Sequence, residues 1–202
     1  MTVIEVFADI TCPFTHAGLR RFVDHRRAVG RPDVALRVRA WPLELVNGVV
    51  IDPHHTAEVV DALRRQIAPE LFAGFSADVL PTSSIPALSL VAGAYRESLV
   101  VGERVSLELR DLLFERGVDI ADPGVLDDVA STFGVRDRHA AGAVGADHLE
   151  GVERGVIGSP HFFTPQGGFF CPALDIRRDV DGRLLVEPDA AGFGRFVAAC
   201  FA

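Results

Sequence analysis

A cysteine followed directly by proline stands where an extended segment gives way to a helical one. Residues 12–15 read Cys-Pro-Phe-Thr. Proline is favoured at the first helical position, so Pro13 places Cys12 at the amino end of the helix that follows. N–H groups at such an end stabilise negative charge, and a cysteine there can ionise well below its usual pKa of about 8.5. Cys12 is therefore a candidate thiolate nucleophile, and an inert buried cysteine at a strand-to-helix turn is the alternative.

Two neighbours of Cys12 are candidates to act on its thiol. His16 lies four residues further along and would share a helix face with Cys12, so an imidazolium there would lower the thiol pKa. Thr15 could donate its hydroxyl to the thiolate. The alternatives are a partly buried His16 without a role, and a Thr15 that only fills space.

A proline at position 160 is the second chemical signal. It follows Ser159 and directly precedes an apolar segment, which suits the start of a strand because proline cannot donate to a strand ladder. X-Pro bonds are the only ones with an appreciable cis population. We expect the Ser159–Pro160 bond to be cis, which would turn the Ser159 backbone toward Cys12. A trans proline at a strand edge is the alternative.

The segments around these residues predict an α/β fold. β-Branched and aromatic residues predict strands, proline and glycine mark the helix ends, and Asp181-Gly182 is a strong hairpin signal. A β-loop-α-β start favours a right-handed parallel crossover. The predicted elements are strands at 2–8 and 34–41 around a helix from Pro13 to Gly30, hairpins at 161–171 and 175–186, and a last helix at 190–201.

The middle of the chain has a helical pattern with no linker. We predict that residues 56–151 form a helical insertion subdomain. Residues 1–55 and 152–202 are then the two parts of one domain that contains the strands. The insertion should cap one side of a four- or five-stranded sheet.

These features together resemble the DsbA-like branch of the thioredoxin superfamily. Within it, the chain is most similar to the cytoplasmic group of FrnE-type dithiol-disulfide isomerases, 2-hydroxychromene-2-carboxylate isomerases and kappa-class glutathione transferases. Residues 39–43 (Arg-Ala-Trp-Pro-Leu), 82–88 and 114–120 add to the resemblance. It implies a thioredoxin-like fold, β-α-β followed by β-β-α, with a large all-helical insertion.

The resemblance also implies roles for single residues. Redox members of the family carry Cys-x-x-Cys; Cys12 matches the attacking cysteine, but Thr15 stands in place of the second one. A single thiol can form a mixed disulfide that an external thiol must then release. The expected catalytic residues are Cys12, Thr15 and His16, and the expected substrate-binding residues are Pro13, Phe14, Ser159 and Pro160.

The function expected from this pattern is thiol-disulfide oxidoreduction by a single active-site thiol, with a low-molecular-weight thiol as co-substrate. The alternatives are a glutathione-type thiol-dependent transferase or isomerase, and a redox-inactive binding protein. Cys171 and Cys200 are interpreted as structural, with Cys171 kept as a candidate resolving thiol. We expect no tightly bound cofactor and no metal site, since no histidine spacing matches a ligand motif.

The composition limits the classes of partner that we expect the protein to bind. The net charge is −8 without a basic stretch, which argues against nucleic acid and anionic membrane surfaces. No apolar run approaches the roughly 20 residues of a membrane span, and the first residues lack the pattern of a signal peptide. We therefore expect a cytoplasmic protein that acts on a small thiol or a disulfide-containing substrate, with a homodimer as an option.

Overall fold

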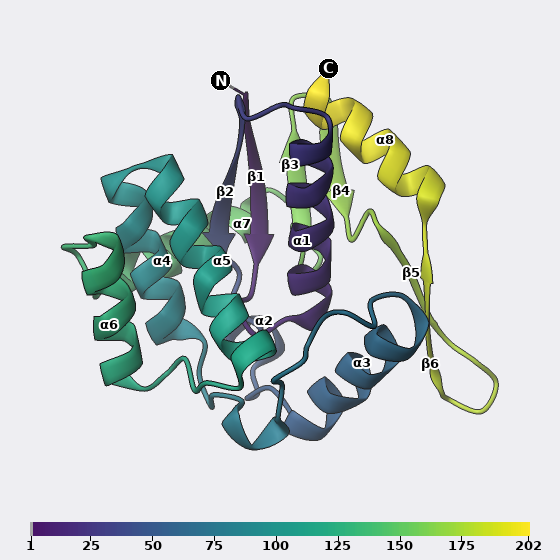
Figure 1. The fold of residues 1–202 in the computed structure, drawn as a ribbon, viewed down its shortest axis with the longest axis horizontal. Coiled ribbons are helices and arrows are strands. Elements are labelled where there is room, and N and C mark those ends of the chain that lie inside the picture. The colour runs from purple at the N-terminus through teal and green to yellow at the C-terminus, as the bar shows by residue number, and fades with distance from the viewer. Residues whose placement is uncertain (1) are drawn as a thin grey trace.

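The computed structural model describes residues 2–202 and has a four-stranded sheet flanked by helices and a separate two-stranded sheet (Figure 1). The main sheet has the strand order β2-β1-β3-β4. β1 and β2 are parallel, whereas β3 pairs antiparallel with both β1 and β4. Its strands are β1 (Thr2–Ala8), β2 (Val34–Ala40), β3 (His161–Thr164) and β4 (Gly167–Phe170). A parallel pair needs a long crossover, and helix α1 (Pro13–Ala28) supplies it between β1 and β2.

The predicted thioredoxin-like α/β fold with helices between its two strand regions is confirmed. β5 and β6 form a separate two-stranded sheet. The remaining elements are α2 (Leu43–Asn47), α3 (Pro53–Gln66), the short 3-10 helix η1 (Ala77–Val79), α4 (Ile85–Glu97), α5 (Leu99–Arg116), α6 (Pro123–Phe133), α7 (Ala141–Glu153), β5 (Leu174–Arg178), β6 (Leu184–Pro188) and α8 (Ala190–Phe201).

The two faces of the main sheet are covered by different helices. α1 and α8 pack over one face, where Phe22 and Phe196 have ring centroids 5.8 Å apart and Phe162 of β3 joins them. Side chains alternate along a strand, so Phe7 of β1 points to the other face. There it meets Trp41 edge-on, and α7 closes over both at Gly151, where a Cβ would clash with the Trp41 ring.

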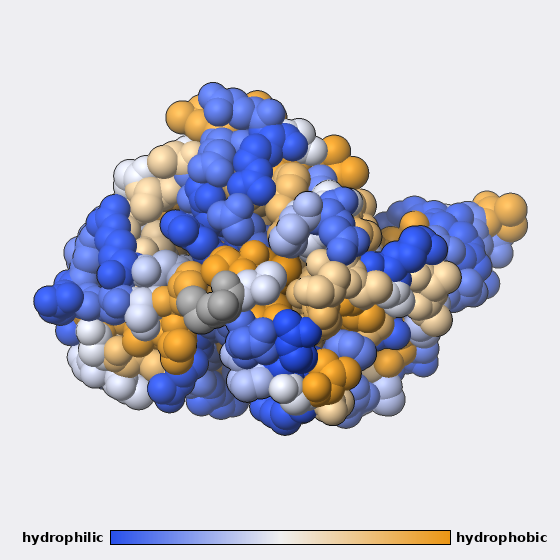
Figure 2. Space-filling model, turned by 90° about the horizontal axis from the view of Figure 1, so that it is seen from above, coloured by the Kyte–Doolittle hydropathy of each residue, from blue (hydrophilic) through white to orange (hydrophobic). Residues whose placement is uncertain are grey.

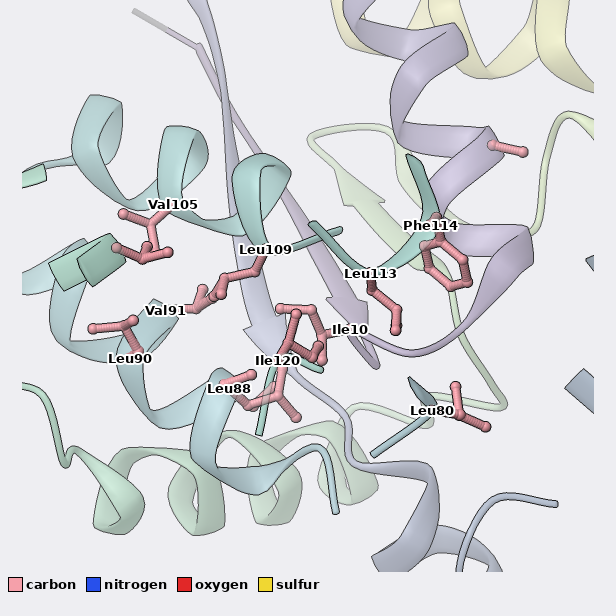
Figure 3. Close-up of a cluster of buried hydrophobic side chains, with 14 of the residues drawn as sticks. Ile10, Leu80, Leu88, Leu90, Val91, Val105, Leu109, Leu113, Phe114 and Ile120 are labelled. Atoms are coloured by element: carbon pink, nitrogen blue, oxygen red, sulfur yellow. The ribbon is translucent and has the colours of Figure 1, made fainter. Parts of the chain in front are cut away.

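The helices between the two strand regions share one buried apolar cluster. α4, α5, α6 and α7 pack together beside β2, and α3 also packs against β6 (Figure 1). The buried apolar cluster of this region includes Ile10 from the loop between β1 and α1, which lies among side chains of the helical segment such as Leu109 and Leu113 of α5 (Figure 3). The loop that carries Cys12 is therefore anchored in the core of the helices.

The surface of the molecule is mixed in character. Seen from above, polar side chains cover much of the face around a central band of apolar ones, and an arm projects to one side (Figure 2). That arm is the β5–β6 hairpin, which also stands away from the body in Figure 1. Between residues 2 and 202, no helix combines the length and the apolar character needed to cross a membrane.

Candidate functional site

Cys12 occupies the N-cap of α1 and Pro13 the first helical position, as the sequence indicates. The cysteine is 5% exposed. Its Sγ–H donates to the backbone carbonyl oxygen of Ser159 at 3.2 Å. The peptide bond between Ser159 and Pro160 is cis. The two segments that carry the chemical signals of the sequence therefore meet at one point, at the amino end of α1.

The hydroxyl groups of Thr15 and Ser159 lie close to the Cys12 thiol. Thr15 Oγ1 and Ser159 Oγ are 2.7 Å apart, and either can be the donor. Ser159 Oγ also accepts the backbone N–H of Asp9 at 2.9 Å. Thr15 is fully buried, so its hydroxyl depends on protein partners and not on water. Thr15 is thus a polar member of the site and more than a filler for a missing cysteine.

The ionisation of Cys12 differs from the sequence expectation of an acidic thiol. Burial raises the pKa of the thiol above its ordinary value, and the charge of Asp9 acts in the same direction. Hydrogen bonds from the Thr15 and Ser159 side chains and the Thr15 backbone N–H lower the pKa, but by less than burial raises it. The helix end does face the sulfur as expected, and desolvation outweighs it.

His16 does not play the expected part beside the thiol. Its Nε2 is 2.6 Å from Glu115 Oε1 in α5, and its ring packs against Phe72 and Phe114. Glu115 Oε1 also accepts the Phe72 N–H, so the carboxylate is the acceptor and His16 Nε2–H the donor. Burial lowers the pKa of His16, which keeps the ring neutral near pH 7. His16 therefore ties α1 to α5 and is not a cation that activates Cys12.

Glu115 completes this contact. Its two oxygens accept the backbone N–H groups of Phe72 and Ala73 as well as the His16 proton. Burial opposes its ionisation, but these donors prevail and lower the pKa of Glu115 to about 2. The carboxylate is thus an ionised anchor between α5, α1 and the loop after α3.

Pro160 and Phe14 border a small apolar cavity. Gly18 and Cys171 also line it. The Cys171 backbone N–H donates to the Pro160 carbonyl at 3.0 Å, so this cysteine lies on the strand side of the proline while Cys12 lies on the helix side. Burial, and then the charge of Cys12, raise the pKa of Cys171 to about 12. Cys171, which the sequence analysis kept as a candidate resolving thiol, is therefore a neighbour of the site.

Asp9 is a site residue that sequence reasoning missed. Its carboxylate is fully buried and accepts four hydrogen bonds, two from Thr11 (backbone N–H and hydroxyl, both 2.7 Å), one from Leu43 N–H (2.7 Å) and one from the Ser84 hydroxyl (2.9 Å). These contacts join the end of β1 to the starts of α2 and α4. An acidic residue three positions before a Cys-Pro pair is the only local signal that pointed to it.

The part of the chain that the structure describes contains no group of three or more His, Cys, Asp and Glu side chains that could hold a metal ion. All three cysteines in it are free thiols. The groups brought together at the site, the Cys12 thiol and the hydroxyls of Thr15 and Ser159, can support the chemistry of a sulfur nucleophile beside hydroxyl groups.

Comparison with known proteins places this geometry in a family. The sequence profile of the DSBA-like thioredoxin domain matches residues 3–178. A 2-hydroxychromene-2-carboxylate isomerase structure has a TM-score of 0.62 at 13% identity, over 83% of this chain and 88% of that chain. The cytosolic disulfide reductase DsbM from Pseudomonas aeruginosa has a TM-score of 0.57 at 14% identity, over 96% and 91%.

At these identities the two structures show a common fold and nothing finer. No sequence among curated proteins matches the chain. The profile, in contrast, spans most of the chain, including Cys12 and the Ser159–Pro160 segment. The chain belongs to the family of proteins with a DSBA-like thioredoxin domain.

Proposed function

We propose that the protein is a thiol-disulfide oxidoreductase that works with Cys12 as its single attacking thiol. The observation that carries the proposal is the placement of Cys12 Sγ at the N-cap of α1, 3.2 Å from the Ser159 carbonyl, with the Thr15 hydroxyl where a second thiol would stand. Membership of the DSBA-like family and the fold shared with a disulfide reductase support it.

The exchange proceeds in two balanced steps. Cys12 loses its proton to water, and its thiolate attacks one sulfur of a disulfide R–S–S–R′, so that Cys12–S–S–R forms and R′–S⁻ leaves to take up a proton. A small external thiolate then attacks the R sulfur and releases the Cys12 thiolate. Thr15 cannot perform this second attack, because a hydroxyl stays protonated near pH 7 and is a weak nucleophile toward sulfur.

The second reactant is then a low-molecular-weight thiol in solution. Pro13, Phe14 and Pro160 supply apolar contacts beside the sulfur, and the backbone of Ser159 supplies a polar edge. We propose that the reaction takes place in the reducing cytoplasm, where small thiols are abundant and free cysteines persist.

Turnover of a small disulfide in the presence of reduced glutathione tests this proposal. The parent should accelerate the exchange, and Cys12→Ser should lose the acceleration completely. Cys200→Ser is the matched control, because that thiol lies in α8 and should leave the rate unchanged. Acceleration that survives in Cys12→Ser would refute a role for this thiol.

A thiol-dependent isomerase or transferase is the second candidate. It is favoured by the pair of hydroxyls of Thr15 and Ser159, 2.7 Å apart, which could hold the sulfur of a bound small thiol. Such an enzyme would conjugate or isomerise its substrate without covalent labelling of Cys12. Glutathione conjugation that persists in Cys12→Ser and disappears in Thr15→Val would favour this candidate over disulfide exchange.

A further inference from the structure

Arg110 is the one fully buried cation among residues 2–202, and no ion pair joins it directly to a carboxylate there. Its Nη1 donates to Ser106 O at 3.0 Å and to Ser106 Oγ at 2.6 Å. Its Nη2 donates to the backbone carbonyl of Asp9 at 3.1 Å. Its Nε has no hydrogen-bond partner. A guanidinium in this position is costly unless nearby negative charge compensates it.

The compensating charge comes from the loop that carries Cys12. Burial lowers the pKa of Arg110 to about 10, and the charges that act against this effect are, in order, those of Asp9, Cys12, Tyr95 and Asp111. The Asp9 carboxylate is itself buried and accepts four hydrogen bonds. Within residues 2–202, no cation forms an ion pair with the Asp9 carboxylate, and the contact between Asp9 and Arg110 runs through the Asp9 backbone carbonyl.

Ionisation of Cys12 places a negative charge in this buried site. Asp9 in the same loop opposes that charge, and Cys171 beyond β4 is a neutral thiol. Tyr95 of α4 and Asp111 of α5 are the other groups whose charges act on the pKa of Arg110. Arg110 is fully buried and reaches the loop through the carbonyl of Asp9, three residues before Cys12.

We propose that Arg110 is a positioning residue that fixes the Cys12 loop through the Asp9 carbonyl and supplies the positive charge against which the Cys12 thiolate forms. The helical segment thereby contributes to a reaction that takes place on the thioredoxin-like part. This inference rests on the proposed role of Cys12. Its tests read the ionisation of the thiol without any turnover, so the two proposals can fail separately.

Alkylation of Cys12 by iodoacetamide at pH 8 measures the thiolate fraction. Arg110→Gln keeps a hydrogen-bond donor and removes the charge, and should slow the reaction about tenfold, which corresponds to one pKa unit. Arg110→Lys keeps the charge and should stay within about threefold of the parent. Arg39→Met is the matched control, because Arg39 is a buried cation paired with Glu5, Asp147 and Glu150 around α7. It should leave the rate unchanged.

A rate in folded Arg110→Gln within twofold of the parent would overturn the proposal, and so would equal slowing in Arg39→Met. If Arg110→Gln does not fold, a second measurement leaves Arg110 in place. The Nε–Hε resonance of Arg110 should shift with the titration of the thiol in the parent and stay constant in Cys12→Ser. A resonance that behaves alike in both proteins would refute the electrostatic coupling.

Discussion

The Sγ atom of Cys12 lies 3.2 Å from the backbone carbonyl oxygen of Ser159, which stands 147 positions later in the chain. The hydroxyl of the same serine accepts the Asp9 N–H and pairs with Thr15. One residue thus holds the thiol through its backbone and the surrounding loop through its side chain. A substitution of the side chain separates these two contributions.

Ser159→Ala should keep the contact to Cys12 and leave the buried Asp9 N–H without its acceptor. An unsatisfied buried donor lowers the free energy of unfolding by about 1–3 kcal/mol, and urea denaturation should show a loss in this range. Ser131→Ala is the control, because that hydroxyl is bonded on the exposed side of α6. Equal stability of Ser159→Ala and the parent would contradict the hydrogen-bond network described for the site.

The pH dependence of Cys12 alkylation follows from its raised pKa. Because the reacting species is the thiolate, the rate should rise about tenfold for each pH unit while the pH stays below the raised pKa, and it should still be rising at pH 8. Iodoacetamide kinetics with Cys171→Ser, to remove signal from the second thiol near the site, give this profile. If the alkylation rate stops rising below pH 8, the amino end of α1 lowers the pKa of Cys12 by more than burial raises it.

Acid should weaken the fold through His16 and Glu115. Both groups bind protons more readily in the unfolded chain, because the pKa of His16 is lowered by burial and that of Glu115 is lowered to about 2 by its donors. The free energy of unfolding therefore falls as the pH drops below about 6.5, and falls further from about 4.5 toward 2.

Urea titrations at several pH values check this expectation. In Glu115→Gln, the free energy of unfolding should depend less on pH below pH 4.5. Glu153→Gln changes an exposed position at the end of α7 and should keep the pH dependence of the parent. If the free energy of unfolding of Glu115→Gln falls as steeply with pH as that of the parent, the contact between His16 and Glu115 is not the cause of the acid sensitivity.

Thr15→Cys should convert the site to a dithiol. The new thiol would stand where the Thr15 hydroxyl now lies, close to Ser159 and Cys12, and should clear a mixed disulfide from Cys12 within the molecule. The half-life of an adduct on Cys12, followed by mass spectrometry, should fall by at least about tenfold. Thr15→Ser keeps a hydroxyl and should leave the half-life as it is. If the adduct on Cys12 lasts as long in Thr15→Cys as in the parent, residue 15 does not lie where it can reach the Cys12 sulfur.

Much of the fold and the two halves of the site were predictable from local signals. Pro13 after Cys12 marks the start of a helix, and Pro160 before an apolar segment marks the start of a strand. Each half of the site is therefore indicated by residues that are adjacent in the sequence. The strands predicted at 2–8 and 34–41 and the helix predicted at 190–201 follow in the same way from periodicity, and the structure ends the second strand one residue earlier, at Ala40.

The partners of these residues were not predictable, because they come from distant elements. His16 bonds to a carboxylate 99 positions away, and that pairing depends on how α5 packs on α1. The pKa of Cys12 was predicted in the wrong direction, since the sequence shows the helix end but not the depth of burial. The contact between Asp9 and Arg110 forms only when α5 packs against the loop that follows β1.

The central claim is that Cys12 reacts as a single thiol. The most direct measurement is the intact mass and the peptide map after exposure of the protein to oxidised glutathione. Attack by the Cys12 thiolate releases one glutathione thiolate, so the account predicts one glutathionyl group on the Cys12 peptide that persists until an external thiol is added. A loss of two hydrogens with a linked Cys12–Cys171 peptide, and no added glutathione, would show a two-thiol cycle and contradict the account.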